Sequence, residues 1–304
     1  MSTTAARPLR ERLTVWLESH LGACLVAPAL LMLGAFTFYP VAGSLWMSLH
    51  DQVLSLPARG EPFVGLANYR ELAAMPVFWR SLRTTLIFVA ASTALETVLG
   101  LGLALCLHAS FRGRGWVRAA ILVPWAMPTV VTSQMWRFLL NDRYGPVSYY
   151  LFGGATPLAE PIGALASIIG ADVWKTTPFA ALVLLAGLQM IPQDLEEAAS
   201  VDGAGAVARF FRITLPLLRP ALLIVVLFRT IDAFRVFDLA FVMTEGGPAD
   251  ATDVLQYFGY RRAFSEGLVG SGAAVSTIVF LLSLSVSVFY VRRVGSALWS
   301  GETR

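Results

Sequence analysis

Charge is what this sequence has least of. Only 14% of its 304 residues are charged, whereas a soluble domain averages about 25%. Hydrophobic residues make up 56% of the chain, and its mean hydropathy is +0.66. The composition argues against a soluble domain and predicts a polytopic membrane protein. A net charge of +3 is too small to suggest a nucleic-acid partner.

Lysine, cysteine and histidine are also scarce. Lys175 is the one lysine and follows Trp174, so the phosphate-binding pattern G-x-x-x-x-G-K-[ST] cannot form and the chain is not an ATPase. The two cysteines, Cys24 and Cys106, lie in apolar runs and are expected to be small buried side chains. No metal-ligand spacing and no Ser-His-Asp constellation emerges. We expect no catalytic residue, metal or cofactor in this chain.

Apolar runs fill most of the sequence. A membrane helix needs about 20 mostly apolar residues, and the runs are continuous rather than alternating, which favours helices over strands. The expected fold is all-α, with six transmembrane helices. The six predicted spans are Leu21–Leu49, Thr85–Leu107, Ala119–Leu140, Ile162–Ile191, Leu217–Met243 and Leu268–Val291.

The distribution of arginine predicts the orientation of these spans, because basic residues favour the cytoplasmic side. With both termini inside, twelve arginines lie in inner segments, namely Arg7, Arg10, Arg12, Arg112, Arg114, Arg118, Arg209, Arg212, Arg219, Arg292, Arg293 and Arg304. Seven lie in outer segments, namely Arg59, Arg70, Arg80, Arg83, Arg143, Arg261 and Arg262. We therefore predict a cytoplasmic tail over 1–20, a six-span transmembrane domain over 21–291 and a cytoplasmic tail over 292–304. The apolar run from Leu21 is expected to be a retained span rather than a signal peptide.

A polar hairpin over 192–216 separates the fourth and fifth spans. Pro192 suits the first turn of a helix, and the acidic residues after it favour the positive end of the helix dipole. Gly203 and Gly205 permit a tight turn before a second helix over about Ala206–Ile213. These features predict a helix-turn-helix at the inner membrane surface. Taken alone, they fit equally well an ordinary loop that its phenylalanines hold to the lipid headgroups.

The spacing within this hairpin is specific. EAA, three residues, Gly, nine residues and then I-x-L-P resembles the EAA loop of ABC-importer membrane subunits. The resemblance implies a coupling helix that docks in a cleft of a separate ATP-binding subunit. The residues that match the pattern are Glu197, Ala198, Ala199, Gly203, Ile213, Leu215 and Pro216.

Three other stretches resemble carbohydrate importers of the maltose and trehalose type. They are Phe228–Thr252, Phe63–Tyr69 and Asp172–Phe179. The resemblance implies alternating-access import of a disaccharide such as trehalose or maltose across the cytoplasmic membrane of a bacterium or archaeon. It also implies four kinds of partner: a second permease subunit, two ATP-binding subunits that hold Mg-ATP, an extracytoplasmic sugar-binding protein and the membrane lipid.

Four charged residues recur at every third position of the fifth predicted span, namely Arg229, Asp232, Arg235 and Asp238. Each charge near the bilayer centre costs at least ~2.5 kcal/mol, so they either pair with other charges or face a water-filled pathway. A structural ladder of ion pairs and a sugar pathway are both open. The candidates for the substrate pathway are Asp232, Arg235, Asp238, Trp174, Lys175 and Gln134.

Several alternatives remain at this level. Glu96 lies alone in the second span; it could pair with a cation elsewhere, or it could relay protons in a secondary transporter. A scaffold that recruits an ATPase without transporting is a further alternative. Within the importer class, glycerol-phosphate or an oligosaccharide is the close alternative to a disaccharide.

Overall fold

The computed structural model describes residues 21–299 apart from 24, 57 and 59. The predictions for the tail over 1–20 and for residues 300–304 lie outside the described residues. The described part of the chain is helical, with two isolated bridges, His50 to Phe63 and Val53 to Leu268. The expected all-α fold is confirmed.

Four helical segments in the described residues are long and apolar enough to cross a membrane. The first is Leu21–Ser48, which ends in η1 (Gly34–Phe38) and α2 (Tyr39–Ser48). The others are α4 (Pro76–His108), α8 (Pro161–Gln189) and the part Val269–Arg292 of α14 (Val269–Trp299). A fifth segment is bent by 65° between Ala206–Leu217 and α12 (Arg219–Phe234). The molecule is thus an all-helical polytopic membrane protein whose described residues contain four candidate spans, or five if the bent pair is one span.

The third predicted span is not one helix. It consists of α5 (Arg114–Ala126) and α6 (Thr129–Leu139). Met127 between them is extended, with φ −73° and ψ 138°, because the ring of Pro128 disfavours the helical conformation of the residue before it. A short helix, α7 (Pro146–Phe152), and a 3-10 turn, η3 (Pro157–Ala159), lead from α6 into α8.

The fifth predicted span is also interrupted. Helix α12 ends at Phe234 with Arg235 as its cap, and the chain resumes as the π-helical turn η5 (Ala240–Thr244). The expectation of one continuous helix from Leu217 to Met243 was therefore wrong. The break matters because it divides the four charges between two separate elements.

Small residues hold the bundle together. A Cβ atom on Gly100 of α4 would lie 2.7 Å from the Cβ of Ala180 on α8, and one on Gly187 of α8 would lie 2.6 Å from that of Ala221 on α12. Such close approach is typical of packed membrane helices. Two buried clusters extend from these contacts, one around Phe88 and Phe234 and one around Leu184.

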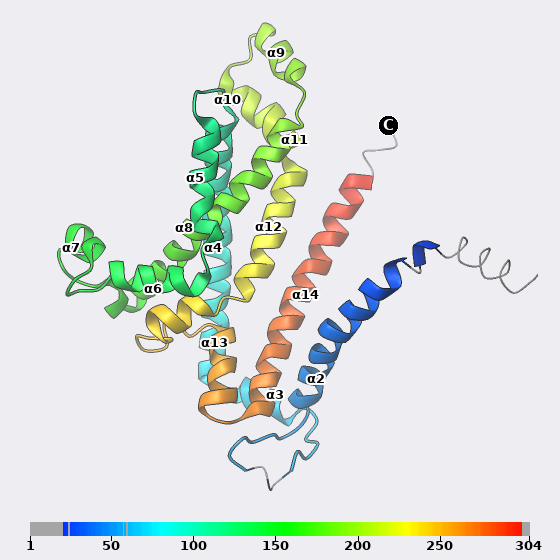
Figure 1. Cartoon of the computed structure of the whole chain (residues 1–304), viewed down its shortest axis with the longest axis vertical. Helices are drawn as coiled ribbons and strands as arrows, with labels where there is room; N and C mark the ends of the chain where they lie inside the picture. Colours follow the sequence, from blue (N-terminus) through cyan, green and yellow to red (C-terminus); the bar gives the residue numbers. More distant parts are fainter. Residues whose placement is uncertain (1–20, 24, 57, 59, 300–304) are drawn as a thin grey trace, which may run out of the picture.

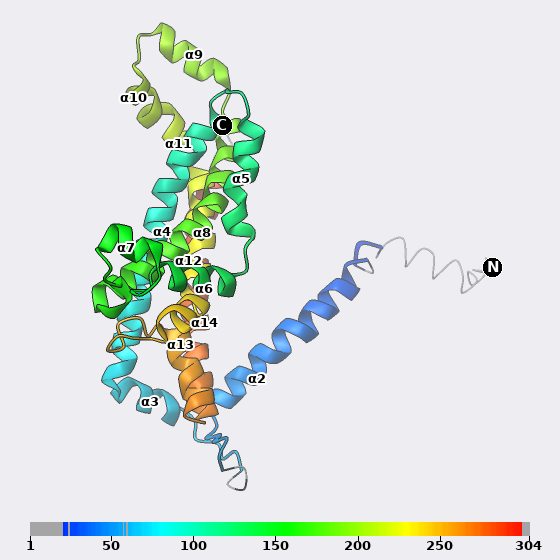
Figure 2. The ribbon, with the colours of Figure 1, turned by 60° about the vertical axis from the view of Figure 1, so that its left-hand side comes forward.

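The bundle has two unlike ends (Figure 1). At one end, α9 (Gln193–Val201) and α10 (Ala206–Arg209) project beyond the long helices. At the other end lie α3 (Ala67–Ala74), α13 (Leu255–Tyr260) and the π-helical turn η6 (Arg261–Ser265). Figure 2 shows that α2 leans away from the other helices. The helices α4, α8 and α12 lie side by side and together surround the candidate site.

Candidate functional site

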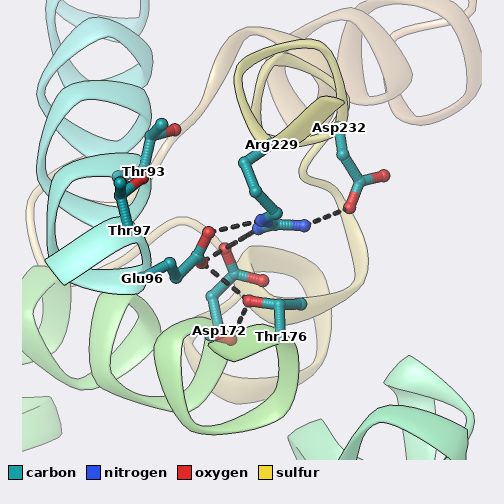
Figure 3. Close-up of polar contacts among 7 residues, drawn as sticks. All are labelled: Thr93, Glu96, Thr97, Asp172, Thr176, Arg229 and Asp232. Atoms are coloured by element: carbon teal, nitrogen blue, oxygen red, sulfur yellow. Dashed lines mark hydrogen bonds and ion pairs between the residues drawn. The ribbon is translucent and has the colours of Figure 1, made fainter. Parts of the chain in front are cut away.

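Three long helices each place a charged residue at one point in the middle of the bundle (Figure 3). Glu96 comes from α4, Asp172 from α8 and Arg229 from α12, and their exposed fractions are 0%, 8% and 3%. These residues are 57 to 133 positions apart in the sequence. The site is therefore assembled by tertiary packing.

Arg229 is the centre of this charge network. Its Nη2 donates to Glu96 Oε1 at 2.9 Å and to Asp172 Oδ2 at 3.0 Å, and its Nε donates to Glu96 Oε2. Its Nη1 donates to Asp232 Oδ2 at 2.6 Å. Thr176 completes the network by donating its hydroxyl to Glu96 Oε1 at 2.7 Å. The planar fork of arginine suits this role because it presents several donors in fixed directions.

The network explains how the helices tolerate buried charge. A buried ion is costly unless it is paired and hydrogen-bonded, and both oxygens of Glu96 accept hydrogen bonds. The expectation that Glu96 pairs with a cation is confirmed by Arg229. Asp232 differs from its neighbours because 66% of its side chain is exposed. It faces outward from the network, into open space.

That space is a cavity of about 180 Å³ lined by residues of α6, α8, α12 and the segment after α12. Four of the six predicted pathway residues line it: Lys175, Asp232, Arg235 and Asp238. The ion pairs of the described residues include none with Lys175, Arg235 or Asp238. These three charged groups are thus available to a bound molecule.

Two predicted pathway residues do not line the cavity. Trp174 is on α8 but packs edge-on against Trp136, with 5.9 Å between the ring centroids. Gln134 is exposed on α6. Polar or aromatic residues that line the cavity and that the sequence analysis did not include among the pathway candidates are Thr129, Asp172, Thr176, Arg229 and Phe237. Phe237 carried a signal, since it precedes Asp238 in one of the stretches that resemble sugar importers.

The four charges of the fifth predicted span do not form a continuous series of ion pairs in the structure. Arg229 and Asp232 pair across one helical turn, as opposite charges three residues apart can. Arg235 caps α12, and Asp238 lies beyond the break. Asp232 is therefore paired with Arg229, and the ion pairs of the described residues include none with Arg235 or Asp238.

The polar hairpin forms the predicted helix-turn-helix. Its first helix, α9, carries Asp194 and Glu196 in the first turn, and Gly203 makes the turn at φ +82°. The second helix begins at Ala206 as predicted and continues through the π-helical turn η4 (Phe210–Thr214) into α11 (Leu215–Leu217). Thr214 donates its hydroxyl to Glu196 Oε1 at 3.2 Å, which ties the two helices together.

The comparisons with known proteins bear on the function of this arrangement. Residues 96–294 match the family model described as "binding-protein-dependent transport system inner membrane component". The chain belongs to this family. The match includes the charge network, the cavity and the hairpin.

Relatives support the same assignment over most of the permease. It is 44% identical to the trehalose/maltose transport system permease protein MalF of Thermococcus litoralis, over 90% of this chain and 94% of that protein. It is 39% identical to the trehalose transport system permease protein SugA of Mycobacterium tuberculosis, over 94% of this chain and 92% of that protein. The fold resembles a chain of a bacterial ABC transporter that imports alginate, with a TM-score of 0.78, 20% identity and coverage of 93% of this chain and 98% of that chain.

The protein is thus the permease of a binding-protein-dependent ABC importer, homologous to trehalose/maltose permeases, and a multi-pass protein of the inner membrane. In such a transporter, ATP hydrolysis lies in a separate subunit. The proton-coupled and scaffold alternatives are set aside because the family is one of ATP-driven transport components.

Outside the charge network lies another buried carboxylate. Asp253, in the loop before α13, accepts hydrogen bonds from Arg261 Nη2 at 2.7 Å and from Ser81 at 3.3 Å. It is fully buried. Burial raises the pKa of Asp253 to about 6, and the nearby Arg261 opposes this shift only in part.

Proposed function

We propose that the cavity beside Arg229 forms part of the translocation pathway for a neutral carbohydrate, most simply a disaccharide such as trehalose or maltose. The observation that carries the proposal is the charge balance of the cavity. Its lining includes three acidic side chains, Asp172, Asp232 and Asp238, and three basic ones, Lys175, Arg229 and Arg235. The acidic and basic charges cancel.

This balance discriminates between the substrate classes. An anionic substrate such as glycerol-phosphate would need surplus positive charge, whereas Glu96 adds one more negative charge directly behind the cavity. The hydroxyls of a neutral sugar instead need both donors and acceptors. Lys175 and Arg235 supply donors, and Asp238 supplies acceptors. The names of the two permease relatives, which refer to trehalose and maltose, favour the same class.

We also propose how many times the chain crosses the membrane and in which orientation. Helices α5 and α6 together would make the third of six crossings, broken at Pro128. Both termini and the hairpin over 192–216 would then lie in the cytoplasm, as the distribution of arginine predicts. The residues expected to couple this hairpin to the ATPase are Glu197, Ala198, Ala199, Gly203, Ile213, Leu215 and Pro216.

The proposed assembly contains a second, related permease subunit, two ATP-binding subunits and an extracytoplasmic sugar-binding protein. Mg-ATP would bind to the partner ATPase, and this chain would need no cofactor of its own. Closure of the ATPase pair would move the coupling hairpins and open the pathway to the outside. In this arrangement, the cavity would be exposed alternately to the two sides of the membrane.

The test is uptake by the complete complex in proteoliposomes, with trehalose, maltose and glycerol 3-phosphate as substrates. We expect uptake of a disaccharide, and we expect Asp238→Asn and Lys175→Gln each to raise KM by about tenfold, the effect of losing roughly 1.4 kcal/mol of binding. Gln134→Ala is the matched control, because Gln134 lies outside the cavity, and should leave KM unchanged. Preferred uptake of glycerol 3-phosphate would contradict the proposal.

A further inference from the structure

A larger groove adjoins the polar cavity on the side away from the hairpin. It lies where α13 and η6 meet α14 and has a volume of about 390 Å³. The two spaces share Phe237, whose side chain lines both. A cavity of 180 Å³ is below the roughly 300 Å³ at which small-molecule pockets begin, whereas the groove is within that range. The polar cavity therefore accommodates only part of a disaccharide.

Aromatic rings form a continuous path along this groove. The ring of Phe237 lies 5.2 Å from that of Tyr260, which lies 5.1 Å from that of Phe264. The rings of Phe241 and Tyr257 support this path, with centroids 5.2 Å and 6.3 Å from that of Phe237. The exposed fraction rises from 36% at Tyr260 to 67% at Phe264, so the path leads from the cavity to the surface.

Small residues pack closely where α13 and η6 meet α14 in this groove. A Cβ atom on Gly272 of α14 would lie 2.6 Å from the Cβ of Ala263 and 2.8 Å from the carbonyl oxygen of Gly259. A side chain there would push α13 and α14 apart. The lining of the groove therefore combines small residues of α14, namely Gly272, Ala273 and Ser276, with the aromatic side chains of Tyr260 and Phe264.

Polar groups lie at the edges of the same groove. The amide of Gln256 and the hydroxyl of Ser276 line it, and the hydroxyl of Tyr260 belongs to the aromatic path. Within the described part of the chain, none of these three groups takes part in a side-chain hydrogen bond. Aromatic faces with free donors and acceptors beside them match a pyranose ring, which has apolar C–H faces and hydroxyls around its rim.

We propose that the groove of Phe237, Tyr260, Phe264, Gln256 and Ser276 is a second carbohydrate-binding subsite that feeds the polar cavity. Sugar rings stack on Tyr260 and Phe264, and then pass Phe237 to reach Lys175, Arg235 and Asp238. Continuity with the charged cavity favours a polar ligand over a lipid chain. The inference rests on the proposed carbohydrate transport.

The first test compares variants of the complete complex in proteoliposomes, using trehalose and maltose. We expect Tyr260→Ala and Phe264→Ala each to raise the KM for uptake by about 3-fold to 12-fold, the effect of losing one aromatic contact. Phe280→Ala, on α14 and outside the groove, is the control and should leave KM unchanged. Unchanged KM in both groove variants would overturn the inference.

The second test detects occupancy directly. In a background with Cys24 and Cys106 replaced by serine, Phe264→Cys should react with a maleimide, and the transported sugar should slow that reaction at least threefold. The same sugar should not protect Phe280→Cys. Loss of the partner permease from purified Phe264→Ala complexes would instead identify the groove as a subunit contact and overturn the inference.

The two proposals fail in different ways. If wild-type complexes take up neither sugar, the proposed function fails. If the wild type transports a sugar but that sugar neither protects Phe264→Cys nor loses affinity in Tyr260→Ala, only the second subsite fails.

Discussion

Arg229 is the residue on which most of the buried charge depends. It contacts Glu96, Asp172 and Asp232 and connects three helices. An arginine in that position cannot be replaced by a lysine without loss, because one ammonium group cannot reproduce the planar fork. The network therefore makes the compensation of charge between α4, α8 and α12 depend on a single side chain.

We predict that Arg229→Met lowers the stability of the complex by about 3–5 kcal/mol, because it leaves Glu96 and Asp172 buried without a counter-charge. Arg235→Met is the matched control: Arg235 is exposed at the end of the same helix, and its loss should cost less than about 0.5 kcal/mol. Thermal unfolding of the purified complex measures both. Adding Glu96→Gln to Arg229→Met should restore part of the loss, and equal effects of the two arginine variants would contradict the role of the network.

A pH effect is predicted at Asp253. Its pKa is raised from 3.8 to about 6 by burial, so between these values the folded protein binds more protons than the unfolded protein. Stability from this group therefore falls as pH rises through 4 to 6, by at most about 3 kcal/mol. Asp253→Asn removes this dependence. The difference in melting temperature, variant minus wild type, should become more positive from pH 4.5 to pH 7.5, and a difference independent of pH would contradict the assignment.

The contact between α4 and α8 requires a small residue at one position of α4. Gly100 and Gly102 are two residues apart on α4, and both are far from the helix ends. A Cβ on Gly100 would meet the Cβ of Ala180 at 2.7 Å and the backbone nitrogen of Ala181 at 3.2 Å, whereas one on Gly102 would meet nothing within 4 Å. The α4–α8 contact thus depends on one glycine and not on its neighbour.

We predict that Gly100→Leu destabilises the permease by about 1–3 kcal/mol, because backbone atoms of α8 block the new side chain and cannot give way. Gly102→Leu introduces the same side chain into the same helix and should be tolerated. Detergent-solubilised complexes can be compared by thermal unfolding and by size-exclusion chromatography. Similar stability of the two variants would show that α4 and α8 are not packed this closely.

The hairpin is the element expected to transmit the action of the ATPase. Glu197 is exposed on α9 and has no ion pair among the described residues, whereas its neighbour Glu196 is bound by Thr214. Four apolar side chains of the hairpin are exposed as well, namely Leu195, Val201, Val207 and Phe211. An exposed acidic group among apolar side chains suits a protein partner with a basic group.

Glu197→Lys is therefore expected to preserve membrane insertion but to lower uptake by at least tenfold, because it places like charges together at the contact. Gln193→Lys adds the same side chain at the start of α9 and serves as control. Co-purification with the ATP-binding subunit and sugar uptake should both be measured. Normal uptake by Glu197→Lys would contradict the coupling role.

The hairpin lies at one end of the molecule, and α13 and the start of α14, which line the groove, lie toward the other end (Figure 1). The groove and the polar cavity meet at Phe237. This arrangement of the groove and the cavity suits a transport pathway. Sugar that enters near Phe264 would meet aromatic rings first and charged groups next. The orientation in the membrane decides whether this direction is inward.

Ala204, in the turn of the hairpin, and Ala67, at the start of α3, mark the two ends. In a background with Cys24 and Cys106 replaced by serine, we expect Ala67→Cys to react with a membrane-impermeant thiol reagent in intact spheroplasts. Ala204→Cys should react only after the membrane is opened. The reverse pattern would place the hairpin outside and exclude its contact with a cytoplasmic ATPase.

The sequence by itself determined the helical class, the membrane setting and the hairpin. Apolar runs of twenty or more residues dictate helices in lipid, because backbone groups there must satisfy their own hydrogen bonds. The EAA spacing is local, so its glycine turn and paired helices could be predicted from neighbouring residues. Glu197 and Gly203 lie where the pattern indicated.

Only the tertiary structure decided which charges meet. Glu96, Asp172 and Arg229 are on three different helices, and no periodicity in one segment relates them. The break after Phe234 separates Arg229 and Asp232, which form an ion pair, from Arg235 and Asp238, which form none in the described residues. The sequence did not predict this break, because the residue pattern on both sides of it is typical of a helix. The aromatic groove likewise arises from residues of separate elements, since Phe237 and Tyr260 approach only when η5, α13 and α14 pack together. Local patterns fix local structure, whereas a site in a helical bundle depends on contacts between segments distant in the chain.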